Sequence, residues 1–416
     1  MMRGRRLWVG LFIGTVLVGG FAPRGTACPF CSSQGQTLTG EVNQADFIVL
    51  GTLKNPKRDP NDILQGTTDL AIETVVKPND FLKGKTTIRI PRFVGVEAKF
   101  LIFCSFYTRP IDHAASALIG PIPLANTETQ MLDAYRAEPI RPDSKIAEYL
   151  RDAIEVRKKD SITQLTFFFN HLDSPDVTVS SDALNEFGRA DYKEVRAVAE
   201  KLTPEKLVRW LNDPNTHAGR FGLYGLMLGH CGKKSDVKTI RTLLEGPKDR
   251  IYSSGLEGLM AAYILLDKQP GWDYLMGILK DANQEFAVRY AGLKVLQFFW
   301  LYRSDVVAHD DVLEGMKLLV ARPDMADLPI EDLRKWGAWG LTDYVLKFAD
   351  VESHKSVPII RRSMLRFALS APAMYPNAAA YVAKIRKEDP ERVQFVEQTL
   401  KDEQPKPAEG AAGAGK

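Results

Sequence analysis

Gly222-Leu223-Tyr224-Gly225-Leu226-Met227 recurs 33 positions later as Gly255-Leu256-Glu257-Gly258-Leu259-Met260. A weaker third copy, Gly292-Leu293-Lys294-Val295-Leu296, follows after another 37 positions. Self-similarity at a period of about 20 to 50 residues is typical of repeat proteins, in which each unit buries one face against its neighbours. The stretch therefore predicts a repeat architecture in the C-terminal part of the chain.

Each copy lies in a segment with the apolar spacing of a helix. The predicted buried faces contain Phe221, Tyr224, Gly225 and Leu228, then Leu256, Leu259, Met260 and Tyr263, then Val288, Ala291, Val295, Leu296 and Phe299. Glycine inside a helix costs about 1 kcal/mol relative to alanine. The repeated glycines therefore predict that neighbouring helix backbones approach closely. The run Phe298–Leu301 is apolar on all sides, so we expect its helix in the middle of the array.

Helical periodicity extends from Arg141-Pro142-Asp143 to about residue 403. Two stretches within it resemble HEAT repeats, namely Leu172–Val177 with Ala183-Leu184, and Lys280–Asn283 with Ala287–Ala291. Arg289 in the second stretch matches the arginine common in that motif. The resemblance implies stacked helix pairs forming an α-solenoid over 144–403. The Pro-, Ala- and Gly-rich end, 404–416, predicts a disordered tail.

The N-terminal part has a different pattern, with alternation or short apolar runs typical of strands. The expected strands include Phe47–Leu53, Leu70–Val76, Thr86–Ile90 and Lys99–Phe106. Short strands separated by turn residues indicate a small antiparallel sheet or a closed barrel. We therefore predict an α+β multidomain protein, with a small antiparallel β-barrel over 28–125, a linker over 126–143 and the solenoid after it.

Ala45–Gly51 and Phe81-Leu82-Lys83-Gly84, together with cysteines near the start of the domain, resemble the OB-like barrel of the netrin and tissue-inhibitor-of-metalloproteinase type. The resemblance covers about 95 residues. It implies that the first cysteines form disulfides with cysteines further along the barrel. In the inhibitors, the backbone of the N-terminal cysteine also chelates a protease zinc ion. Only Cys28 matches that position, and this chain has Cys-x-x-Cys where the inhibitors have Cys-x-Cys.

The first 27 residues predict a secretory signal peptide. Arginines precede the uncharged run Leu7–Phe21, and the small residues Gly25 and Ala27 follow it. Cleavage between Ala27 and Cys28 would leave Cys28 at the mature N-terminus. The alternatives are a retained N-terminal anchor and lipid modification of Cys28. We expect an exported bacterial protein, located in the periplasm or cell envelope or secreted.

Removal of the signal peptide takes away four arginines and no acidic residues, and the formal net charge falls from +3 to about −1. The remaining chain has no Lys/Arg-rich block, so its charge does not favour nucleic acid as a partner. No later segment is apolar enough to predict a membrane span. The hydrophobic fraction of 45% is that of an ordinary folded protein.

Cys28-Pro29-Phe30-Cys31 is the motif closest to known chemistry, because it resembles one form of the glutaredoxin active site. Such an active site lies between a strand and a helix start that lowers the thiol pKa. Here only the leader precedes the motif, so we favour a structural disulfide. Cys104, in the last predicted strand of the barrel, is the expected partner of Cys28 or Cys31. With Cys231, the four cysteines allow three full pairings.

The other candidate residues have simpler structural interpretations. The six histidines are scattered and predict no zinc site. His230-Cys231 suits a helix end, and His309-Asp310-Asp311 suits a solvated helix start. Trp300, Trp336 and Trp339 have the spacing of core residues, with a ligand groove as the alternative.

These patterns predict a scaffold without enzymatic activity or a cofactor, which binds a protein or peptide partner through the solenoid. Two alternatives stay open. One is a thiol-disulfide oxidoreductase that uses Cys28 and Cys31. The other is a metalloprotease inhibitor that presents Cys28.

Overall fold

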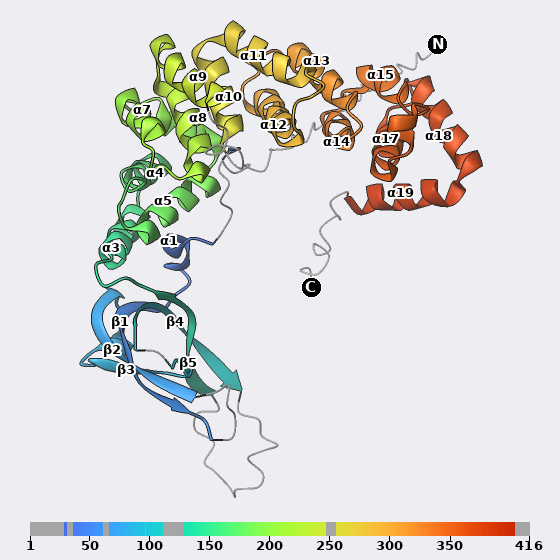
Figure 1. Cartoon of the computed structure of the whole chain (residues 1–416). Helices are drawn as coiled ribbons and strands as arrows, with labels where there is room; N and C mark the ends of the chain where they lie inside the picture. The colour runs from blue at the N-terminus through green and yellow to red at the C-terminus, as the bar shows by residue number, and fades with distance from the viewer. Residues whose placement is uncertain are drawn as a thin grey trace, which may run out of the picture.

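The structure, a computed structural model, describes residues 29–30, 36–60, 66–95, 97–110, 128–246 and 255–403. It consists of a small antiparallel sheet followed by a long series of helices that curves into an arch (Figure 1). The predicted α+β order, with strands before helices, is confirmed. The predicted signal peptide and tail lie outside the described residues.

The sheet has five antiparallel strands in the order β3-β2-β1-β4-β5. They are β1 Phe47–Arg58, β2 Gly66–Lys77, β3 Thr87–Ile90, β4 Lys99–Pro110 and β5 Glu128–Pro139. The edge strands β3 and β5 are not hydrogen-bonded to each other, so the sheet does not close and the barrel prediction is wrong. Strand β5 also occupies most of the expected linker over 126–143. It was missed because it contains few apolar residues, as an edge strand can.

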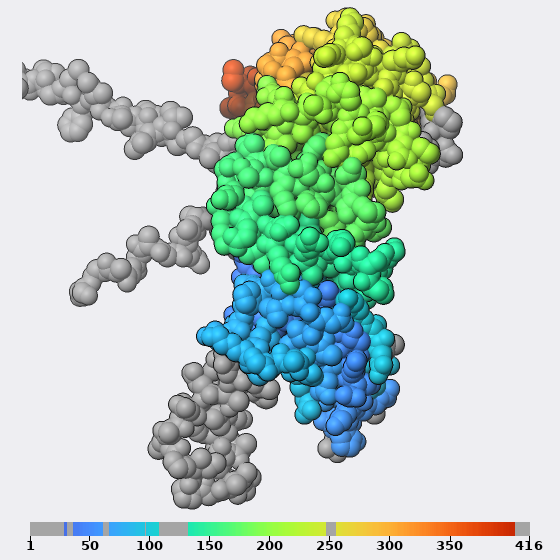
Figure 2. All heavy atoms as spheres, turned by 90° about the vertical axis from the view of Figure 1, so that its left-hand side faces the viewer, coloured from blue at the N-terminus to red at the C-terminus, as the bar shows by residue number. Residues whose placement is uncertain are grey.

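The sheet contributes to two separate cores, because successive side chains of a strand point to opposite faces. Phe47, Val49 and Leu53 of β1 pack in a core within the sheet. Ile48 and Leu50 pack in the large core that continues through the helices. Figure 2 shows the strands (blue) directly against the first helices (green). The sheet and the helical array therefore share one continuous core.

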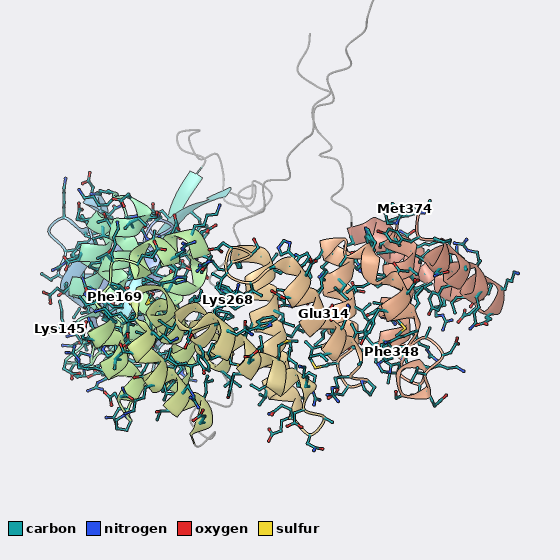
Figure 3. The ribbon with its side chains drawn as sticks, turned by 90° about the horizontal axis from the view of Figure 1, so that it is seen from above. Lys145, Phe169, Lys268, Glu314, Phe348 and Met374 are labelled. Carbon is teal, nitrogen blue, oxygen red and sulfur yellow. The ribbon has the colours of Figure 1, made fainter. Side chains whose placement is uncertain are left out.

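Apart from the short α1, which precedes the sheet, the helices follow β5 in the chain. They are α1 Leu38–Glu41, α3 Ile146–Val156, α4 Ser161–Phe169, α5 Val177–Arg189, α6 Tyr192–Ala199, α7 Pro204–Asn212, α8 Phe221–Cys231, α9 Val237–Glu245, α10 Leu256–Leu266, α11 Lys268–Lys280, α12 Phe286–Tyr302, α13 His309–Val320, α14 Asp327–Trp336, α15 Thr342–Leu346, α16 Glu352–Lys355, α17 Pro358–Ser370, α18 Pro376–Glu388 and α19 Pro390–Glu403. Seen from above, they form a row from the end near Lys145 to the end near Met374 (Figure 3).

Local sequence signals explain several helix starts. The side chains of Asp160, Asp176 and Asp191 accept hydrogen bonds from the free backbone N–H groups at the starts of α4, α5 and α6. Helices α17 and α18 begin with proline, whose missing N–H is not needed at that position. These helix boundaries are therefore set by the local sequence.

The repeated glycines lie where α8 and α10 touch. A Cβ atom on Gly258 would lie 2.1 Å from the carbonyl oxygen of Gly222, and one on Gly225 would lie 3.1 Å from the Gly258 backbone. Gly255 has φ = 126°, a conformation that other residues rarely adopt. The prediction of close helix approach is confirmed. In α12, Phe298 and Phe299 are buried as expected, but Leu301 is 57% exposed.

Candidate functional site

Of the three predicted cysteines, the structure describes only Cys104. Cys28 and Cys31, and with them the predicted cleavage site at Ala27, lie outside the described residues. Cys104 is a free thiol, buried in β4 within the core of the sheet. Burial raises the pKa of Cys104 to about 12, so it is protonated at neutral pH and a poor nucleophile. The expected disulfide of Cys104 with Cys28 or Cys31 finds no support.

Phe30, the residue between Pro29 and Cys31, packs on the helical array and not on the sheet. Its side chain is 4% exposed and belongs to the large core of the helices. The ring centroid lies 4.9 Å from that of Phe298 in α12. Cys28 or Cys31 was expected beside Cys104, but both lie outside the described residues, so that expectation stays a prediction. Burial of an aromatic ring of this size explains the position of Phe30.

Phe30 packs at the edge of an aromatic cluster that includes Phe298 and Tyr192. The ring centroid of Tyr192 lies 5.2 Å from that of Phe298 and 4.8 Å from that of Tyr302. The Tyr192 hydroxyl is hydrogen-bonded to His230 Nε2, with 3.1 Å between the two atoms. Burial lowers the pKa of His230 to about 4, so its imidazole is neutral at pH 7. This histidine is a packed structural group.

Gly222 leaves room for the backbone of Phe30. A Cβ atom at position 222 would lie 2.7 Å from the Phe30 carbonyl oxygen and 3.3 Å from Gly255 Cα. A side chain there would displace the N-terminal segment or the neighbouring helix. The glycine repeat therefore serves two contacts, between α8 and α10 and between α8 and Phe30.

A second anchor follows at α1, which lies on the inner side of the arch beside α5 (Figure 1). Asp182 of α5 is 3% exposed and accepts hydrogen bonds from Leu38 N (2.5 Å), Thr39 Oγ1 (2.5 Å) and the Tyr149 hydroxyl (2.9 Å). These bonds satisfy backbone donors at the start of α1 that have no partner within the helix. We call residues 29–30 and 36–46 the N-terminal strap.

The end of the strap is attached to the sheet. Lys77 Nζ donates to the carbonyl oxygens of Val42 (2.8 Å) and Ala45 (2.5 Å). Buried Glu41 forms an ion pair with Arg136 of β5, with 3.6 Å between Glu41 Oε1 and Arg136 Nη1. The strap therefore contacts α12, α8, α5 and two strands, and it ties the helical array to the sheet.

A buried ion pair lies close to the strap. Glu186, one helical turn after Asp182 in α5, accepts a hydrogen bond from Arg157 Nη2 at 2.6 Å. Burial raises the pKa of Glu186, while Arg157 and then the Thr37 hydroxyl act in the opposite direction. Glu186 is therefore largely removed from solvent, and the positive charge of Arg157 helps to keep it ionised.

The other predicted residues lie elsewhere on the array. Trp300 stacks on both Trp336 and His309, with centroid distances of 4.4 and 3.9 Å. All three belong to exposed or half-buried surface, and His309 begins α13 as predicted. Cys231 ends α8, and burial raises its pKa to about 11. These residues do not meet Cys104 or the strap anchors at α1.

Sequence reasoning missed Asp182, Glu186 and Tyr149. One signal was present, because Asp182 and Glu186 are spaced by four residues on the apolar face of α5 that also carries Val179 and Ala183. Charged residues on such a face are buried and need partners. Leu38, whose backbone N–H donates to Asp182, is 144 residues away in the chain, which no local pattern indicates.

The chain matches no known protein-family model, and no curated protein resembles it significantly. Within the described ranges, no group of three or more His, Cys, Asp or Glu side chains is placed to hold a metal ion. Among the helices that the structure describes, none is long and apolar enough to cross a membrane.

Proposed function

We propose that this protein is an exported, non-enzymatic scaffold that binds a protein or peptide partner through its helical array. The proposal includes an α-solenoid of HEAT-like type, as the sequence resemblance implies, with the OB-like resemblance limited to the open sheet. A curved row of helices offers a long continuous surface, which is the usual means of binding in such proteins. The arch in Figure 1 supports this assignment.

The distribution of exposed apolar side chains carries the proposal. Among the described residues, the large apolar side chains with the greatest exposure are Tyr107, Val177, Phe286, Tyr290, Leu301, Val351, Ile359, Met374 and Phe395. All but the first two belong to the C-terminal part of the array, from α12 onward. Concentrated exposed apolar surface is typical of interaction sites. The partner would therefore bind to the half of the array that follows α11.

The test is cross-linking of the full mature protein in cell envelopes, followed by identification of the cross-linked partner. Met374, 77% exposed, and Leu301 are replaced together by Glu, and Val177→Glu in the N-terminal half is the matched control. We expect the double variant to lose the partner while the control keeps it. Loss in both variants, or in neither, would contradict the proposed surface.

Export and processing belong to the same proposal. Cleavage between Ala27 and Cys28 would leave Phe30 as the third residue of the mature chain. The mature protein would therefore keep the residue that packs on α8 and α12. Edman sequencing and intact mass of the protein from the cell envelope would show the cleavage site and any lipid on Cys28. A mature protein that begins after Phe30 would contradict the proposal, because the first anchor would be missing.

A thiol oxidoreductase is the second candidate, and the docking of Phe30 favours it. The cysteine pair flanks a residue fixed on folded helices, so the motif is not isolated from the fold. Alkylation of the unreduced protein followed by intact mass tests this function. A reducible Cys28–Cys31 disulfide that turns over a dithiol substrate would support it, and two freely alkylated thiols would exclude it.

A further inference from the structure

A pocket of about 210 Å³ lies in the array between α4, α5 and α6, and α5 is also the helix that anchors α1 of the strap. Its lining includes Arg157, Leu165, Phe168, Glu186, Arg189 and Glu194. Two of the residues are apolar, two carry a positive charge and two a negative charge. The pocket therefore combines an apolar wall with both signs of charge.

Two buried polar atoms in this lining lack a partner. Glu186 is 5% exposed; its Oε2 accepts from Arg157, but its Oε1 has no hydrogen-bond partner. The Thr37 hydroxyl favours the charged form of Glu186, so it lies on the same side of α5 as this carboxylate. Arg157 Nε is also buried and unpartnered. Buried polar atoms in native proteins almost always have partners, so the Glu186 oxygen in particular indicates a ligand that brings a donor.

The remaining charges restrict the ligand further. Arg189 and Glu194 also line the pocket, and the charge of Arg189 favours the charged form of Glu186. A simple anion would meet the carboxylates of Glu186 and Glu194, and a simple cation would meet the two guanidinium groups. Only a ligand with both charges is matched on all sides, because unpaired like charges are rejected.

We propose that this pocket binds a free α-amino acid. The ammonium group would donate to Glu186 and Glu194, and the carboxylate would accept from Arg157 and Arg189. A small apolar side chain would lie against Leu165 and Phe168. The volume is below the roughly 300 Å³ at which sites for drug-sized ligands begin, which fits so small a molecule. A peptide places its terminal charges too far apart for this arrangement.

Isothermal titration calorimetry on the full mature chain tests the proposal, with alanine, valine and leucine as probes. Their N-acetyl and amide derivatives, which lack one charge each, are the matched ligands. We expect saturable binding of at least one amino acid, and at least about tenfold weaker binding of both derivatives, because each lacks one of the two charges that the pocket would pair. Equal binding of a derivative, or no binding of any amino acid, would overturn the proposal.

Two variants test the position of the site. Glu186→Gln should weaken binding about tenfold or more, since it removes the charge that the ammonium group pairs with. Ala190→Leu fills the pocket from its rim and does not alter the Glu186–Arg157 pair, so it should abolish binding in a folded protein. Glu155→Gln, on the exposed side of α3, is the control. Unchanged binding in Ala190→Leu, or a crystal soaked in the amino acid that holds water alone in the pocket, would refute the assignment.

Discussion

At the scale of single residues, Gly222 satisfies two packing constraints at once. Its missing side chain leaves room for the Phe30 carbonyl on one side and for the α10 backbone on the other. Gly277, in the middle of α11, has nothing within 4 Å of where its Cβ would lie. The chain thus offers two helical glycines that differ in their surroundings, and comparing them separates packing from helix propensity.

Gly222→Ala should lower the free energy of unfolding by about 1–3 kcal/mol, because the added Cβ overpacks a closed contact. Gly277→Ala should leave stability unchanged or raise it by up to about 1 kcal/mol, through helix propensity alone. Urea unfolding of both variants provides the measurement. Similar effects of the two substitutions would show that Gly222 does not hold the strap.

His230 is the second residue with a measurable consequence. Its pKa is lowered to about 4 by burial, whereas an unfolded histidine titrates near 6.5. Between these values the unfolded state binds a proton that the folded state does not, so stability falls as the pH drops from 6.5 towards 4. The stability that depends on a neutral His230 is fully present above pH 6.5, the pKa of the unfolded histidine.

The expected loss from this one residue is about 2 kcal/mol between pH 7 and pH 5. His230→Gln should show a correspondingly smaller difference in unfolding free energy between the two pH values, although it is less stable at pH 7. Urea titrations of wild type and variant at both pH values measure this. An identical pH dependence in the two proteins would contradict the burial of a neutral His230.

At the scale of elements, the strap connects parts that are far apart in the chain. Phe30 attaches to α8 and α12, α1 attaches to α5 through Asp182, and Lys77 holds the segment before β1. Short segments such as α1, with four residues, are not stable helices alone. Their order comes from these tertiary contacts, so the loss of one anchor should affect the others.

Phe30→Ala should lower the free energy of unfolding by about 3–5 kcal/mol, the range for removing a buried phenylalanine side chain. Phe286→Ala, at the exposed start of α12, is the matched control and should change stability by less than about 0.5 kcal/mol. Hydrogen exchange should show faster exchange in α1 and α8 in the Phe30 variant alone. Unaltered exchange of α1 would mean that the two anchors act independently.

At the scale of the whole molecule, the sheet and the helices share one core. Ile48 and Leu50 pack in the same cluster as the helices, and Arg151 of α3 donates two hydrogen bonds to the Val75 carbonyl oxygen of β2. Domains joined by a long exposed linker move independently, whereas only the short segment 140–145 separates β5 from α3 here.

We therefore expect the sheet and the adjacent helices to unfold together in urea. Tryptophan fluorescence reports on the array through residues such as Trp210 and Trp272, and hydrogen exchange of β1 reports on the sheet. The two probes should give coincident transitions, the usual sign of cooperative unfolding. A sheet that loses protection at clearly lower urea would show that the shared core does not couple the two parts.

The sequence by itself determined the order of strands before helices, the helical periodicity and the close approach at the repeated glycines. These features depend on residues close together in the chain, whose spacing and turn chemistry can be read directly. The strands richest in apolar residues were also found. The edge strand β5 was not, because its sequence is mostly polar.

Only the tertiary structure decided where Phe30 docks, that the sheet stays open and that Asp182 and Glu186 are buried. The first and the third depend on contacts between residues far apart in the chain, such as Leu38 with Asp182, or Phe30 with Phe298. Local patterns do not specify such pairings, since many apolar or polar partners are chemically equivalent. The shape of the folded array selects among them, and it places Phe30 against α12.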